Sequence, residues 1–329
     1  MRGWWQDLTD LVLPGECGGC GAPRAVLCAQ CRAVLGGAAV RRVRPVPEPP
    51  GLPVVHAAAP YADEVRATLL AHKERGALAL AGPLGAALAR AVRAGLREGE
   101  ARPGAQVAGS LAWPGDAAAR VPVRPGDAAA VREGVAPVLL VPVPSGRRAV
   151  RARGHDPARR IALAAAADLR RSGLPARVLG VLRQRRPVAD QSGLNFRQRL
   201  DNLLGALTVA PGGARLLSAG PVVLVDDVLT TGASLAEAAR ALRAAADGPG
   251  GPHGLPAGPI SNAARTAAVY GGESWESREE QNVGSRRERT GRRPGRRRIA
   301  GADGSRGAVD VVCAAVVAAS PDAFQINRN

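Results

Sequence analysis

The segment that most constrains the fold of this chain runs from residue 222 to residue 234. Four apolar residues, Val222 to Val225, precede two acids, a Thr-Thr-Gly loop and the start of a helix. An apolar run of this kind is typical of a strand buried on both faces, and the Ala-rich stretch from Ser234 to Ala246 predicts a helix. A strand that feeds a helix in this way predicts an α/β fold with a parallel sheet.

The residues that follow this strand predict a binding site for a sugar phosphate. Ligands of open α/β sheets lie beyond the carboxyl ends of the strands. There Asp226 and Asp227 offer acceptors for two vicinal hydroxyls and can lie near a Mg²⁺ ion. A loop of hydroxyls and amides at a helix N-terminus suits a phosphate dianion; it consists of Thr230, Thr231, Gly232, Ala233 and Ser234. The alternative is an ordinary strand, turn and helix with Ser/Thr capping.

The rest of the chain supports the same fold class, an α/β sheet flanked by helices with a small N-terminal metal module. Further strands are predicted at residues 54–59, 138–141, 176–182 and 309–318, and helices at 4–13, 62–72, 78–97 and 157–171. We assign residues 1–50 to the module and its linker, in which residues 41–53 are rich in Pro and Arg, and residues 51–329 to the α/β domain. Residues 98–136 and 247–308 lack periodicity and predict disordered insertions.

Two basic segments accompany the acid pair and suit an anionic ligand. A turn with arginines and free amides after the strand 138–141 suits pyrophosphate, because guanidinium groups bind phosphate oxygens in pairs; its candidates are Ser145, Arg147, Arg148, Arg153 and Gly154. A solvated basic helix start is the alternative. The polar segment 183–202, hinged by Gly193, predicts a flexible lid with Arg183, Gln191 and Arg199, or else a plain surface hairpin.

Four of the five cysteines fall in one window, and their spacing predicts a zinc site. Cys17 and Cys20 form one CxxC unit, and Cys28 and Cys31 form another seven residues later. Four thiolates close the coordination sphere of a tetrahedral ion, so the zinc is expected to be structural. A redox pair is the alternative, and Cys313 is expected to be a buried core thiol.

Charge and composition narrow the class of partner. The net charge is +17, and much of it lies in residues 147–160, 183–199 and 285–298. A chain this basic suits phosphorylated ligands, nucleic acid or anionic surfaces. No signal-peptide pattern and no apolar run of 18 residues occurs, and the cysteine pattern suits a reducing compartment, so a cytoplasmic location without a membrane span is expected.

Together these segments resemble the ComF family of competence-associated, phosphoribosyltransferase-like proteins, and residues 222–234 resemble the phosphoribosyl pyrophosphate motif of type I phosphoribosyltransferases. The shared order is the cysteine cluster, Lys73 to Gly76, Pro142 to Gly154, Gln191 to Asn202 and Asp226 to Ser234. The resemblance covers about two-thirds of the chain. It departs at His155-Asp156-Pro157, where the family has Phe-Asn-Gln, and neither insertion has a counterpart.

The resemblance implies a protein that binds Mg²⁺-phosphoribosyl pyrophosphate, with Asp226 and Asp227 as the catalytic pair, and transfers the phosphoribosyl group to a nitrogen acceptor. It also implies the alternative of a non-catalytic DNA-uptake factor that binds single-stranded DNA, contacts the uptake machinery or senses the sugar phosphate. A homodimer is a further expectation. A third hypothesis treats residues 285–298 as a non-specific polyanion binder. His56, His72 and His253 receive no role, and His155 a structural one.

Overall fold

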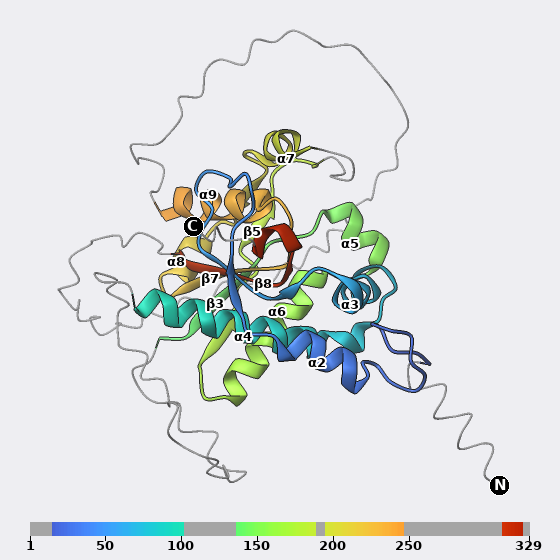
Figure 1. Ribbon diagram of the computed structural model, residues 1–329. Helices are drawn as coiled ribbons and strands as arrows, with labels where there is room; N and C mark the ends of the chain where they lie inside the picture. Colours follow the sequence, from blue (N-terminus) through green and yellow to red (C-terminus); the bar gives the residue numbers. More distant parts are fainter. Residues whose placement is uncertain (1–14, 102–135, 189–194, 247–310, 325–329) are drawn as a thin grey trace, which may run out of the picture. The chain divides into compact units, whose positions relative to one another are not determined.

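A computed structural model describes residues 15–101, 136–188, 195–246 and 311–324, all of which belong to one compact unit (Figure 1). Several predicted segments lie outside the described residues: the helix at 4–13, most of the insertion 98–136, all of the insertion 247–308, and the lid residues Gln191 and Gly193.

The described strands and helices alternate for most of the chain. The strands are β1 (Arg41–Val43), β2 (Val55–Pro60), β3 (Val138–Pro142), β4 (Ala176–Val178), β5 (Leu182–Gln184), β6 (Leu207–Val209), β7 (Val222–Leu229) and β8 (Val311–Ala319). The α-helices are α2 (Ala29–Gly37), α3 (Asp63–Glu74), α4 (Ala81–Glu100), α5 (Arg147–Arg153), α6 (Pro157–Arg171), α7 (Phe196–Leu203), α8 (Gly213–Leu217) and α9 (Ala233–Ala246). Two 3₁₀ turns, η1 (Leu78–Leu80) and η4 (Pro321–Phe324), complete the order.

Six strands form one mixed, mostly parallel sheet in the order β1-β2-β8-β7-β3-β4. β2, β8, β7, β3 and β4 run parallel to their neighbours, and only β1 pairs antiparallel, with β2. A separate antiparallel ribbon joins β5 and β6. In Figure 1, α4 and α6 lie on one side of the sheet and α9 on the other.

The central strands are buried on both faces, as their unbroken apolar runs predict. Successive residues alternate between two apolar clusters: Leu140 and Val223 pack on the side of α4 and α6, whereas Leu139 and Leu224 pack on the side of α9. Many of the facing residues are alanines, so the helices approach the sheet closely. At Gly85 of α4, an added Cβ would lie 2.8 Å from the backbone carbonyl carbon of Ala164 in α6.

The strand order reverses between β3 and β7, which is the point at which sheets of this kind bind ligands, and we call the carboxyl edge of the sheet at this reversal the crevice. After β3 the chain crosses through α6 to β4 at the sheet edge, then returns to β7 on the opposite side of β3 and continues through α9 to β8. At such a reversal the two crossover helices cover opposite faces, so the carboxyl ends of the two strands are left open to a ligand. β3 pairs with β7 as far as Pro142 with Val225, and β7 continues for four residues beyond that point.

Several sequence predictions of secondary structure need correction. The sheet is mixed rather than parallel, because part of the predicted linker forms the short edge strand β1, whose residues Arg-Arg-Val carry no apolar period. The predicted strand at 176–182 is two strands in different sheets, β4 and β5. The predicted insertion at 98–136 starts too early, since α4 continues to Glu100, and the predicted arginine-rich turn contains the helix α5.

The cysteine segment packs directly against the α/β core. Cys17, Leu27 and Leu35 belong to the same apolar cluster as Leu80 and Leu84. At Gly18 an added Cβ would lie 2.6 Å from a methyl group of Leu80, so the backbone of the cysteine segment lies against η1.

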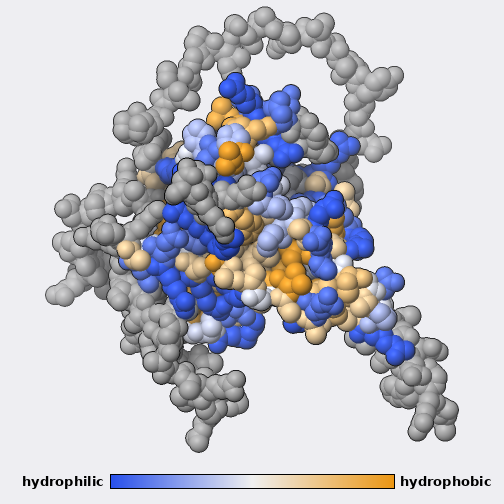
Figure 2. All heavy atoms as spheres, in the orientation of Figure 1, coloured by the Kyte–Doolittle hydropathy of each residue, from blue (hydrophilic) through white to orange (hydrophobic). Residues whose placement is uncertain are grey.

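No described helix is long and apolar enough to cross a membrane. On the face drawn in Figure 2, apolar patches of the described residues are interrupted by hydrophilic ones.

Candidate functional site

The acid pair lies in the last part of β7, at the carboxyl edge of the sheet. On one side β8 still pairs with it, Asp226 opposite Val316, whereas on the other side the pairing with β3 has ended. Each carboxylate accepts from the next amide: Asp226 Oδ1 from the N–H of Asp227 at 2.8 Å, and Asp227 Oδ1 from the N–H of Val228 at 2.9 Å. These local bonds fix both side chains and leave the second oxygen of each to other partners.

One of those partners is Lys73, which belongs to the last turn of α3. Its Nζ lies 3.2 Å from Asp227 Oδ2, and the Lys73 side chain is 37% exposed while that of Asp227 is 11% exposed. The charge of Asp227 raises the pKa of Lys73, against the lowering effect of burial. Lys73 is therefore a protonated cation that faces the carboxylate pair.

The charged form of Asp226 is disfavoured, in contrast to that of Lys73. Burial raises its pKa well above the ordinary value, and the neighbouring charge of Asp227 raises it further, more than the N–H of Asp227 and the charge of Lys73 lower it. Two adjacent carboxyls with a single ammonium paired to one of them resist holding two negative charges. The pair therefore favours a ligand that brings hydroxyl donors or positive charge to Asp226.

The loop that follows the acid pair turns sharply into α9. Gly232 has φ +75°, a left-handed conformation that glycine adopts without a steric penalty. A Cβ at Gly232 would lie 3.1 Å from a methyl group of Leu52 and 3.3 Å from Pro45 Cγ, so the segment 45–52 packs against this loop. Arg243 of α9 holds the same segment by donating to the carbonyl of Gly51 at 2.8 Å. What the sequence predicted as a linker is thus part of the wall around the loop.

The turn after β3 lies on the β3 side of the crevice, at the carboxyl end of that strand. The backbone N–H and the hydroxyl of Ser145 each lie 3.4 Å from a carboxylate oxygen of Asp156. Asp156 also caps α6, accepting from the N–H of Arg159 at 3.2 Å, and Pro157 occupies the first turn of that helix. The cap therefore ties the Ser145 turn to the start of α6.

The arginines predicted to bind pyrophosphate lie on α5, immediately after this turn. Arg147 and Arg148 are exposed in its first turn. Arg153, at its last turn, is mostly buried and pairs with Glu74 of α3, Nη1 to Oε1 at 2.9 Å, while its buried Nε has no hydrogen-bond partner among the described residues. Gly154 ends α5 in a left-handed conformation with φ 74°.

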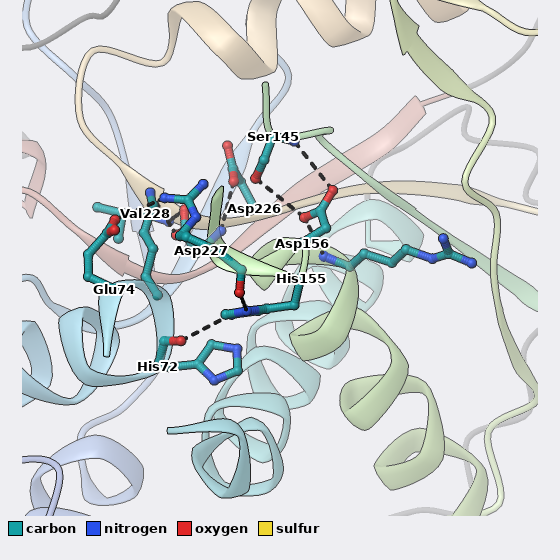
Figure 3. A network of polar contacts seen from close by, with 11 residues as sticks. His72, Glu74, Ser145, His155, Asp156, Asp226, Asp227 and Val228 are labelled. Atoms are coloured by element: carbon teal, nitrogen blue, oxygen red, sulfur yellow. Dashed lines mark hydrogen bonds and ion pairs between the residues drawn. The ribbon is translucent and has the colours of Figure 1, made fainter. Parts of the chain in front are cut away.

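His155 joins α5 to α3 from below the acid pair (Figure 3). Its two ring nitrogens lie 3.1 Å from the carbonyl of Arg153 and 3.2 Å from the carbonyl of His72, and its ring meets that of His72 edge-on at 5.5 Å. Burial lowers the pKa of His72, which is fully enclosed. Both histidines thus brace the backbone behind the crevice, as the structural role expected for His155 implies.

Only part of the predicted lid is described. Arg183 is exposed on β5, and Arg199 lies on α7, whose N-terminus is closed by a reciprocal pair of hydrogen bonds between Asn195 and Gln198. A Cβ at Gly146 would lie 3.8 Å from Gln184 Nε2, which places the β5 end beside the Ser145 turn. Arg186 donates to the carbonyls of Asn202 and Leu204 at 3.0 Å and joins the two ends of this segment.

No family model matches the chain, and no curated protein matches it.

The four clustered cysteines form the second candidate site, and they could bind a metal such as zinc. All four sulfur atoms lie within 4.8 Å of one another, and Cys20 Sγ and Cys28 Sγ are 3.6 Å apart. A tetrahedron with bonds of about 2.3 Å has sulfur-to-sulfur edges of about 3.8 Å. The observed separations fit such an ion with little movement.

The backbone around these thiols also suits bound thiolates. The N–H of Cys28 donates to Cys17 Sγ at 3.3 Å, and the N–H of Cys31 donates to Cys28 Sγ at 3.4 Å. Burial raises the pKa of Cys17, but the surrounding amides outweigh it and lower the pKa to about 6. An added Cβ at Gly19 would lie 2.7 Å from Cys31 Sγ, so a glycine is needed there for the sulfur to approach.

Cys313 lies apart from this cluster. It is 1% exposed in β8, and burial raises the pKa of its thiol to about 12, as suits a core residue.

Sequence reasoning missed three contributors to the first site. Lys73 appeared only within a family motif, although its being the sole lysine of the chain was a usable signal. Asp156 was detectable as a helix cap before Pro157. Leu52 carried no signal, because its position over Gly232 depends on the path of the whole segment from β1 to β2.

Proposed function

We propose that the crevice between β3 and β7 binds a ribose 5-phosphate group, and that its ligand is phosphoribosyl pyrophosphate. The observation that carries the proposal is the position of Asp226 and Asp227 near the carboxyl end of β7, shortly before a glycine-containing loop that opens α9. A diol on the carboxylates would direct the attached 5-phosphate to the amides and hydroxyls of residues 230–234, where a helix N-terminus favours negative charge.

The other wall supports the same ligand. Ser145 and the arginines of α5 follow β3 at the same edge of the sheet, within reach of an anion attached to the other end of the sugar. The proposal extends to the family: the order of motifs and this crevice support a type I phosphoribosyltransferase-like fold and membership of the ComF family. Zinc at the four cysteines, as a structural ion, belongs to the same proposal.

The residues present fit a Mg²⁺ ion only in part. Two carboxylates lie at the site, but Lys73 already neutralises Asp227, so a cation would depend on the phosphates of the ligand for most of its oxygen ligands, as Mg²⁺ commonly does. When bound, the ion would neutralise charge on the diphosphate. The chain's own residues would hold the ribose, keep its anomeric carbon at the mouth of the crevice and screen the departing charge with Arg153 and the exposed arginines of α5.

The test is Mg²⁺-dependent binding of phosphoribosyl pyrophosphate, measured by calorimetry. Asp226→Asn and Asp227→Asn should each weaken binding by about tenfold or more, because each removes a carboxyl oxygen that would contact a ribose hydroxyl. Asp168→Asn is the matched control, since Asp168 is a partly buried carboxylate paired with Arg93 at the far end of α6. Equal binding by all four proteins would refute the proposal.

A second function is favoured by one specific observation. Arg147, Arg148 and Arg151 are exposed on α5, and Arg183 and Arg197 are exposed on β5 and α7, as suits a polyanion such as single-stranded DNA. Release of pyrophosphate over a panel of bases would support transfer. Ligand binding without release, together with salt-sensitive binding of single-stranded DNA, would support the non-catalytic alternative.

A further inference from the structure

The only lysine of the chain contacts the acid pair of the candidate site. Lys73 is the sole lysine among 45 basic residues. It lies at the end of α3, with Nζ 3.2 Å from Asp227 Oδ2. Its side chain is more than three times as exposed as that of Asp227, so it is the member of this pair that a ligand entering the crevice meets first.

The same helix end also reaches the arginine-bearing wall. Glu74, the residue after Lys73, pairs with Arg153 of α5 at 2.9 Å, and the positive charge of Arg153 lowers the pKa of Lys73 while the two acids of β7 raise it. Lys73 therefore lies between a carboxylate of β7 and a guanidinium of α5. A second cation next to Arg153 is favourable only where anions lie close by, and Asp227 supplies one of them.

The chemistry of the proposed ligand indicates a second anion for Lys73. In phosphoribosyl pyrophosphate the diphosphate is attached to C1, the carbon next to the one that bears the 2-hydroxyl. If Asp227 accepts from that part of the diol, the diphosphate lies beside the same carboxylate. An ammonium carries three N–H donors, and its ion pair with Asp227 requires one of them.

We infer that Lys73 contacts the diphosphate of the ligand and selects for it, in addition to pairing with Asp227. The inference rests on the proposed function of the crevice. It assigns Lys73 as a specificity-determining residue: a ligand with a diphosphate on C1 gains its ammonium, and a ligand without one does not.

The test compares three ligands, phosphoribosyl pyrophosphate, inorganic pyrophosphate and ribose 5-phosphate, each titrated with Mg²⁺ into the wild-type chain and Lys73→Gln. The variant should bind the first two roughly tenfold to a hundredfold more weakly, as expected for one lost hydrogen bond to a charged group. Ribose 5-phosphate should bind with its affinity changed about twofold or less, since it lacks the group that Lys73 contacts. Arg75→Gln, which removes an exposed charge two residues further on, should behave as wild type with all three.

The outcomes separate the inference from the proposal beneath it. If Lys73→Gln weakens all three ligands equally, Lys73 acts only through Asp227 and the inference is wrong. Unchanged affinity for pyrophosphate in Lys73→Gln also overturns it. If Asp226→Asn and Asp227→Asn do not weaken any of the three ligands, the proposed function itself fails.

A second measurement avoids any folding defect of the variant. Reductive methylation with ¹³C-formaldehyde labels one side chain in this protein, because Lys73 is its only lysine, and dimethyl-lysine keeps its charge and one N–H. Pyrophosphate should shift the Lys73 methyl resonance at concentrations that saturate binding, and ribose 5-phosphate should leave it in place. A resonance that does not respond to bound pyrophosphate refutes the contact.

Discussion

Replacing Gly232 by alanine tests how the phosphate loop is constrained. Gly232 adopts φ +75°, and its missing Cβ would crowd a methyl group of Leu52 at 3.1 Å and Pro45 Cγ at 3.3 Å. The left-handed conformation costs an alanine about 1–2 kcal/mol. Alanine also lowers the conformational entropy of the unfolded chain, which offsets about 0.4–1 kcal/mol of this loss. The crowding against Leu52 and Pro45 lowers the unfolding free energy by about 1–3 kcal/mol more.

Gly212 provides a matched control for the backbone cost. It has φ +76° with no atom within 4 Å of an added Cβ, so Gly212→Ala should lose about 1 kcal/mol of unfolding free energy from strain alone. Gly232→Ala should lose about 2–3 kcal/mol, because crowding adds to the same strain. Urea unfolding followed by circular dichroism measures both.

Ligand binding should also differ between the Gly232 and Gly212 variants. Gly232→Ala should also lose most of its affinity for phosphoribosyl pyrophosphate, because the added methyl displaces the loop or the segment 45–52 that covers it. Gly212→Ala should keep that affinity. Equal stability losses in the two variants would show that Leu52 and Pro45 do not constrain the loop. Full binding by Gly232→Ala would remove the loop from the proposed site.

Three further substitutions, at Asp226, Cys31 and Gly85, should change stability or metal content in a definite direction. Asp226→Asn should increase the unfolding free energy at pH 7–8 and leave it unchanged near pH 3. A carboxyl whose folded pKa is raised contributes stability below its unfolded pKa and loses it as the pH rises through the folded pKa. Urea titrations at several pH values measure this difference in unfolding free energy. Cys31→Ser should lose about one equivalent of zinc by elemental analysis and unfold more readily, because it removes one of four ligands. Gly85→Ala should lower the unfolding free energy by about 1–3 kcal/mol through its clash with the backbone of Ala164. Its control is Gly82→Ala, whose added methyl meets no atom within 4 Å and should raise the unfolding free energy by up to about 1 kcal/mol. Thermal or urea unfolding measures both.

Each of these expectations has a clear contrary result. A Cys313→Ser variant should keep its zinc, and equal metal loss in Cys31→Ser and Cys313→Ser would contradict the assignment of the four-cysteine site. A lower stability of Asp226→Asn at neutral pH would contradict the direction of its pKa shift. A harmless Gly85→Ala would contradict the close packing of α4 on α6.

The elements of the sheet that carry strong local patterns were predictable from sequence. The strand at Val222 and the helices α6 and α9 were identified closely because their apolar periods are uninterrupted and their ends carry caps or turn residues. The acid pair was expected directly after the strand but lies within it, because pairing with β8 extends β7 to Leu229, past residues whose types disfavour a strand.

Other features depended on contacts that no local pattern encodes. β1 and the β5–β6 ribbon are three-residue strands held by partners distant in sequence, and α5 consists largely of arginines without an apolar face. The ion pair of Lys73 with Asp227 joins residues 154 positions apart, and only the tertiary fold brings α3 beside β7. Propensity cannot supply such information, because it acts within a few residues.

The attachment of α3 has a consequence for any change at the cysteines. The first half of this helix lies against the cysteine segment: an added Cβ at Gly19 would come within 3.2 Å of Thr68 Oγ1. Its last turn holds β7 through Lys73 and α5 through Glu74. Oxidation of the four cysteines would therefore loosen one end of α3, whose other end carries Lys73 and Glu74, and this change should be measurable as a change in ligand affinity.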